Sequence, residues 1–64
     1  MTQYERLQLD WLAVSKYGMD SEDVDAALRV AALDEVTVSL DEAKRAVTRY
    51  AVEGGLTIGP ILGA

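Results

Sequence analysis

The sequence contains neither cysteine nor histidine, and it has no long apolar run. These absences exclude disulfides and thiolate nucleophiles, and they remove the usual zinc ligands and imidazole acid–base catalysis. No window reaches the roughly 18 apolar residues of a membrane span, and the first residues lack the pattern of a secretory signal. We therefore expect a soluble, cytoplasmic protein that does not span a membrane, is not an enzyme and has no cofactor.

The chain is also short and acidic. Its 64 residues carry eleven acidic and six basic side chains, which gives a formal net charge of −5. A single small domain of this length is stabilised by only about 3–5 kcal/mol, so a partner or a self-association surface is expected. Negative net charge disfavours nucleic acid as that partner, because affinity for nucleic acid depends on neutralising phosphates. Nothing in the sequence indicates a small-molecule ligand.

The strongest helical signal covers residues 40–53. Ser39 and Glu42 have the spacing of a capping box, and Gly54 follows the last turn, where glycine commonly closes a helix. One face is apolar at intervals of three and four residues, as expected for a helix packed on a core. Its members are Leu40, Ala43, Val47, Tyr50 and Ala51.

Two further helices are predicted, at residues 3–17 and 21–34. In the first, a core stripe is formed by Tyr4, Leu7, Trp11 and Val14. This assignment leaves Leu9 and Leu12 pointing outward. In the second, Asp20 or Ser21 is the cap, and apolar residues occupy two faces, with Val30 and Leu33 on the outer one.

The segment between the second and third helices contains Val36 and Val38 in alternation. This pattern is typical of a short strand, or of a turn that anchors the third helix to the core, and we favour the anchor. The fold expected for residues 1–64 is therefore an all-α, three-helix domain.

The last nine residues, 56–64, form an uncharged tail. It contains Leu56, Ile58, Ile61 and Leu62, and Gly59-Pro60 excludes a continued helix. An apolar tail of this kind is expected to dock, either on the helices of its own chain or on another chain.

Residues 32–58 resemble part of a known DNA-binding fold. The residues that carry the likeness are Ala32-Leu33, Val36, Val38-Ser39, Ala43, Ala46-Val47, Tyr50, Glu53-Gly54 and Leu56. They resemble the second helix of a winged helix-turn-helix domain and its entry into the wing. The resemblance implies a helix-turn-helix-like second half, a rudimentary wing in the tail, and DNA contacts by Lys44, Arg45, Thr48 and Arg49.

The carboxylates do not form a recognisable catalytic or metal site. The acidic residues 20–25 lack the glycine and the distal glutamate of a calcium loop, so we assign them to helix capping. Three acids, Asp25, Asp41 and Glu53, are each spaced four residues from an arginine, which is typical of ion pairs on exposed helix faces. The predicted pairs are Asp25 with Arg29, Asp41 with Arg45, and Arg49 with Glu53.

The leading functional prediction is a small non-enzymatic subunit or adaptor that binds protein. Its partner would be a copy of itself or a larger assembly such as a virion. The apolar residues left over after core formation define the expected binding surface: Leu9, Leu12, Val30, Leu33, Leu56, Ile58, Ile61 and Leu62. The alternative is a compact winged helix-turn-helix regulator of transcription.

Overall fold

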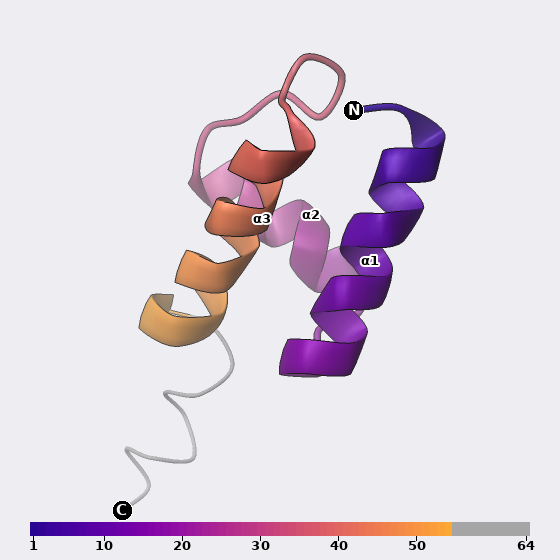
Figure 1. Cartoon of the computed structure of the whole chain (residues 1–64). Helices are drawn as coiled ribbons and strands as arrows, with labels where there is room; N and C mark the ends of the chain where they lie inside the picture. The colour runs from indigo at the N-terminus through magenta and orange to yellow at the C-terminus, as the bar shows by residue number, and fades with distance from the viewer. Residues whose placement is uncertain (55–64) are drawn as a thin grey trace, which may run out of the picture.

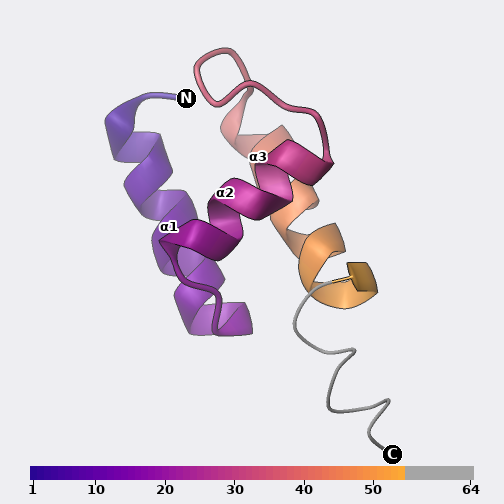
Figure 2. The same cartoon turned by 180° about the vertical axis from the view of Figure 1, so that it is seen from behind.

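The computed structural model describes residues 1–54, and this part of the chain is helical without strands (Figure 1). Helix α1 spans Gln3–Tyr17, α2 spans Ser21–Val30 and α3 spans Leu40–Arg49. The last helix continues into a π-helical turn, η1, at Tyr50–Gly54. Helices α1 and α3 stand beside each other and α2 crosses both of them, as the view from behind shows (Figure 2). The prediction of an all-α fold with three helices is confirmed.

The first two helices each begin with a complete capping box. Thr2 Oγ1 accepts the Glu5 N–H at 3.1 Å, and the Glu5 carboxylate accepts the Thr2 N–H at 2.8 Å. Asp20 and Asp23 make the same reciprocal pair at 2.9 and 3.2 Å. Each box satisfies two backbone N–H groups that have no partner within the helix. Of the two candidates for the α2 cap, Asp20 is the residue that acts.

Helix α3 begins where predicted, but its capping is only half of a box. Ser39 Oγ accepts the Glu42 N–H at 3.2 Å. The Glu42 carboxylate accepts the Ser39 hydroxyl at 3.4 Å, and no bond to the Ser39 N–H is present in the described residues. The single side-chain cap is sufficient to start the helix, because the N-cap acceptor is the main source of N-terminal stabilisation.

Helix α2 ends at Val30, earlier than the predicted end at residue 34. The reason is Ala32, whose φ of +59° places it in the left-handed region. The Ala32 N–H donates to the Arg29 carbonyl and the Leu33 N–H donates to the Leu28 carbonyl, both at 2.9 Å. These two bonds form a Schellman motif, which brings Leu33 back against the core. Alanine occupies the position that glycine usually takes, so the sequence carried no stop signal.

Alanine makes up much of the core. Five of the eleven buried apolar residues are alanines, and the fully buried large side chains are Leu9, Met19, Val24 and Val47. The complete set is Leu9, Ala13, Met19, Val24, Ala27, Leu28, Val38, Ala43, Ala46, Val47 and Ala51. Small side chains allow the helix axes to approach closely, but each buries little apolar area. The apolar face predicted for residues 40–53 is confirmed, since its members are buried or half-buried.

The face of α1 that enters the core is the opposite of the predicted one. Leu9 and Ala13 are buried and Leu12 is half-buried, while Leu7 and Trp11 lie on the exposed side. At 100° per residue, Leu9 points about 160° away from both Leu7 and Trp11. The sequence assignment of the α1 core stripe is therefore wrong, although its helix bounds are confirmed.

Residues 31–39 connect α2 to α3 through hydrogen-bonded turns. The Asp34 carbonyl accepts the N–H groups of Thr37 and Val38, and the Asp34 carboxylate accepts the Val36 N–H at 2.9 Å. Val38 is buried and anchors the start of α3, whereas Val36 is exposed. The anchor prediction therefore holds for Val38 and is wrong for Val36. The predicted tail and its rudimentary wing lie outside the described residues.

The left-handed alanine gives a direct test of how α2 ends. Replacing Ala32 by glycine removes backbone strain of about 1–2 kcal/mol from the folded state. It also raises the conformational entropy of the unfolded chain, which lowers stability by roughly 0.5–1 kcal/mol. We expect Ala32→Gly to raise the free energy of unfolding by about 0.5–1 kcal/mol in urea titrations followed by circular dichroism.

Ala31 supplies the matched control for this substitution. It precedes Ala32, is also exposed, and has right-handed φ and ψ of −81° and −1°. Ala31→Gly should leave stability unchanged or lower it by up to about 1 kcal/mol. Equal destabilisation by both substitutions would contradict the assigned backbone conformation at Ala32.

Candidate protein-binding surface

The most conspicuous surface feature is an apolar line along the outer face of α1. It consists of Tyr4, Leu7, Trp11 and Val14, which are 70%, 62%, 71% and 54% exposed, and we call it the α1 stripe. Helix α1 lies at the edge of the fold, and both views leave its outer side uncovered by α2 and α3 (Figures 1 and 2). The residues thought to form the core of α1 thus form its surface. Their spacing of three, four and three is that of a and d positions in a heptad repeat.

The two edges of the α1 stripe differ in charge. On one side lie Gln8 and Ser15, which are uncharged. On the other side lies Asp10, and beyond it the start of α2 with Asp20. Leu7, Trp11 and Val14 line a shallow hollow of about 340 Å³ together with this second edge. We call the two sides the neutral edge (Gln8 and Ser15) and the acidic edge (Asp10 and Asp20).

A cluster of polar groups around Arg6 fixes the rotation of α1. The guanidinium donates from Nε to Asp10 at 2.9 Å, and from Nη1 to Asp25 and Glu35 at 2.9 and 2.7 Å. Its Nη2 donates to the carbonyl and the hydroxyl of Ser21 at 3.1 and 3.0 Å. The Arg6 side chain is only 14% exposed. This Arg6 cluster ties α1 to the start of α2 and to the following connection.

The ionisation of Arg6 is secured by its partners. Burial alone would lower the pKa of the guanidinium, since it penalises the charged form. Hydrogen bonds with Asp10, Asp25 and Glu35, and the charge of Asp10, outweigh burial and raise the pKa above its ordinary value. The cluster therefore contains a permanent positive charge surrounded by three acids.

The Arg6 cluster explains why the α1 stripe faces outward. Arg6 and Leu9 are three residues apart and so lie about 60° from each other around the helix. The rotation that brings Arg6 to Asp25 and Glu35 also turns Leu9 into the core. Leu7 and Trp11 are then directed to solvent. Local periodicity does not reveal this choice of face, because Asp25 and Glu35 are distant from Arg6 in the sequence.

The predicted binding residues differ in their exposure to solvent. Val30 is exposed on α2, Leu12 and Leu33 are half-buried, and Leu9 is fully buried. Leu9 therefore cannot contribute to a surface, because it faces the alanine-rich core instead of solvent. Leu56, Ile58, Ile61 and Leu62 lie outside the described residues.

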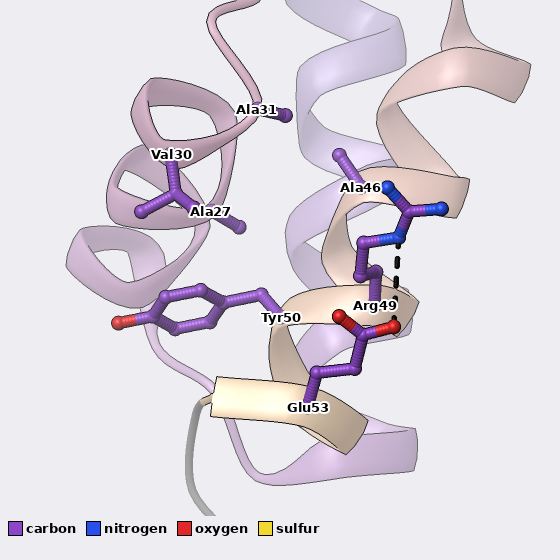
Figure 3. A pocket seen from close by; sticks show the side chains of 7 residues that line it. All are labelled: Ala27, Val30, Ala31, Ala46, Arg49, Tyr50 and Glu53. Carbon is purple, nitrogen blue, oxygen red and sulfur yellow. Dashed lines mark ion pairs between the residues drawn. The ribbon is translucent and has the colours of Figure 1, made fainter.

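Val30 also borders a hollow between α2 and α3, with a volume of about 430 Å³. Figure 3 shows the Tyr50 ring below Val30 and Ala27, and the Arg49–Glu53 pair on the α3 side. The walls also include Ala31 and Ala46. The two charged groups in the hollow pair with each other at 3.8 Å, so the hollow suits an apolar side chain better than a polar reaction.

The ion pairs predicted from sequence spacing are mostly absent. Asp25 pairs with Arg6 instead of Arg29, because the α1–α2 packing brings the guanidinium to it. Within residues 1–54, no ion pair joins Asp41 to Arg45. The predicted pair of Arg49 and Glu53 is confirmed; both are well exposed, so the pair contributes little stability.

Among the described residues, the outer face of α3 therefore has one more unpaired cation than predicted, Arg45. Lys44, Arg45, Thr48 and Arg49 are all exposed, and Lys44 and Arg45 have no ion-pair partner in the described part of the chain. Thr48 shares a hydrogen bond of 2.9 Å with the Tyr17 hydroxyl of α1. The four residues predicted to contact DNA therefore share one surface.

Residues 1–54 contain no group of three side chains arranged to hold a metal ion. Asp20 and Asp23 serve the α2 capping box, as expected from the sequence. None of the helices described is long and apolar enough to cross a membrane. Comparison of the chain with protein-family models, curated proteins and solved structures gave no match.

Removing the Arg6 guanidinium should destabilise the fold. Arg6→Met leaves three acids close together without their shared cation and breaks hydrogen bonds to charged groups. We expect the free energy of unfolding to fall by about 1–3 kcal/mol in urea titrations. Arg45→Met is the matched control, since Arg45 is exposed and has no ion-pair partner within residues 1–54, and it should change stability by less than about 0.5 kcal/mol. Similar effects of both substitutions would contradict the role given to the Arg6 cluster.

Proposed function

We propose that the protein is a small non-enzymatic subunit or adaptor that binds another protein through the α1 stripe. The observation that carries this proposal is the exposure of Tyr4, Leu7, Trp11 and Val14 along one line. The chain has four aromatic residues, one Trp and three Tyr, and two of them belong to the α1 stripe. Aromatic side chains dominate the energetics of protein interfaces.

The size of the α1 stripe supports a docking role. From the exposed fractions, its four side chains offer on the order of 400 Å² of apolar surface. Contiguous apolar patches of roughly 300–600 Å² on monomeric proteins are commonly functional. The acidic edge formed by Asp10 and Asp20 would limit docking to partners without acids at that place.

The partner would be a copy of the chain or a component of a larger assembly, such as a virion. Docking on α1 requires no rearrangement of the described fold, because the α1 stripe is already exposed and the helix rotation is fixed by the Arg6 cluster. A binding role also accounts for the exposed apolar α1 stripe. This surface is an apolar line and not a set of titratable side chains of the kind that catalysis would need.

Site-specific photo-crosslinking tests the proposal. A benzophenone amino acid replaces Tyr4 on the α1 stripe, and in a separate variant it replaces Lys44 on the outer face of α3 as the control. After irradiation of cells that naturally produce the chain, we expect protein adducts from the Tyr4 position at several times the yield from the Lys44 position. Equal yields, or no adduct at either position, would overturn the proposal.

The second candidate is DNA binding by α3, favoured by one observation. Lys44, Arg45 and Arg49 are exposed on one face, and two of them have no ion-pair partner within residues 1–54. Two features oppose this candidate. The net charge is −5, and residues 31–39 form a longer connection than the usual three- or four-residue turn of a helix-turn-helix.

Salt dependence measures whether α3 contacts phosphates. If the three cations each neutralise one phosphate, log K for duplex DNA should fall with log salt at a slope of about −2 to −3. Lys44→Ala should reduce the steepness of that slope by about 1, and Arg29→Ala on α2 is the control. Absence of binding at low salt would eliminate this candidate and leave the protein-binding proposal in place.

A further inference from the structure

The heptad spacing of the α1 stripe identifies the geometry of what covers it. Tyr4 and Trp11 are seven residues apart, as are Leu7 and Val14, so the four residues alternate as a and d positions over two heptads. A second helix with the same spacing can cover such a seam along its length. In this chain α1 itself supplies such a helix, and its seam is exposed along its whole length.

We propose that the α1 stripe is the interface of a parallel homodimer, in which the α1 helices of two copies lie side by side. This inference rests on the proposed protein-binding function and names the partner as a second copy. Equivalent residues then meet across the seam, with Leu7 opposite Leu7 and Trp11 opposite Trp11 of the other copy. Such an interface is isologous and closed, so it produces dimers and not fibres.

Charge selects the parallel arrangement over the antiparallel one. A two-fold axis parallel to the helices places the acidic edge of one copy against the neutral edge of the other. Asp10 then faces Ser15, and no like charges meet. An antiparallel pair centred on the α1 stripe would instead place both acidic edges together, with the two Asp10 side chains near each other. Like charges juxtaposed at an interface oppose association, and this chain already carries a net charge of −5.

The available area sets the strength of the dimer. Two copies of the α1 stripe bury on the order of 800 Å² in total, which is below the roughly 1,200 Å² of a standard stable interface. Association in the range of about 10 µM to 1 mM is therefore expected. Trp11 is the single tryptophan of the chain and lies in the seam, so its fluorescence reports the interface directly.

The first test measures mass and Trp11 emission over a concentration series of the full chain. We expect the mass by sedimentation equilibrium to rise toward twice the monomer value, with a blue shift of Trp11 emission over the same range. Leu7→Glu should weaken association at least 30-fold, because it places two carboxylates opposite each other in an apolar seam. Val36→Glu adds the same charge at an exposed residue of the connection between α2 and α3 and should leave association unchanged. Both positions are exposed, so circular dichroism should show an intact fold for each variant.

The second test determines orientation and uses the absence of native cysteine. In a glutathione redox buffer, Leu7→Cys should form a disulfide-linked dimer at least tenfold more readily than Val30→Cys, since d positions face each other only in the parallel pair. Equal cross-linking, or a wild-type chain that stays monomeric to 1 mM, would overturn the dimer. In that case, photo-adducts from the Tyr4 position with a protein of another mass would still support the proposed function. Absence of both would remove the two proposals together.

Discussion

The hydrogen bonding of Arg6 is the constraint on which the rest of the structure depends. Helix α1 has two apolar faces, and hydrophobic burial alone would favour the one with Trp11 and Leu7, since larger side chains remove more area from water. That rotation would carry Arg6 away from Asp25 and Glu35 and leave their charges without a shared partner. It would also force large side chains into a seam lined by alanines, where overpacking costs about 1–3 kcal/mol. The inward face with Leu9 and Ala13 fits both requirements.

The same cluster organises the connection between α2 and α3. Glu35 reaches Arg6, while the amino group of Met1 donates to the carbonyls of Glu35, Val36 and Val38 at 2.8–3.0 Å. Val38 is buried in the core a few residues later. A segment without regular secondary structure is thus held at several points, and each bond offsets part of the conformational entropy lost on ordering it. The start of α3 is positioned by these contacts as well as by its Ser39 cap.

Sequence reasoning succeeded where the signal was local and failed where it was not. The starts of α2 and α3 followed from Asp20 and Ser39, whose effects act within one helical turn. The end of α2 was missed because Ala32 adopts the left-handed conformation without the glycine that announces it. The buried face of α1 was missed because its choice is made by residues 19 and 29 positions away in the chain, at Asp25 and Glu35. The exposure of Val30 on the candidate surface was predicted. The α1 stripe was identified as an apolar line, but it was assigned to the core instead of the surface.

One face of α1 packs into the core, and we propose that the other binds a partner. The inward face has small side chains and a charged residue, Arg6, with fixed partners. It therefore favours one rotation of α1 about its axis over other rotations. The outward face is larger, aromatic and without charge, so it would be the better core if the polar constraint were absent. The large apolar side chains of α1 stay exposed only because the Arg6 cluster holds the helix in this rotation. Exposure of the α1 stripe is therefore a property of the whole fold, set by the contacts that Arg6 and Leu9 make on the inward side of the helix.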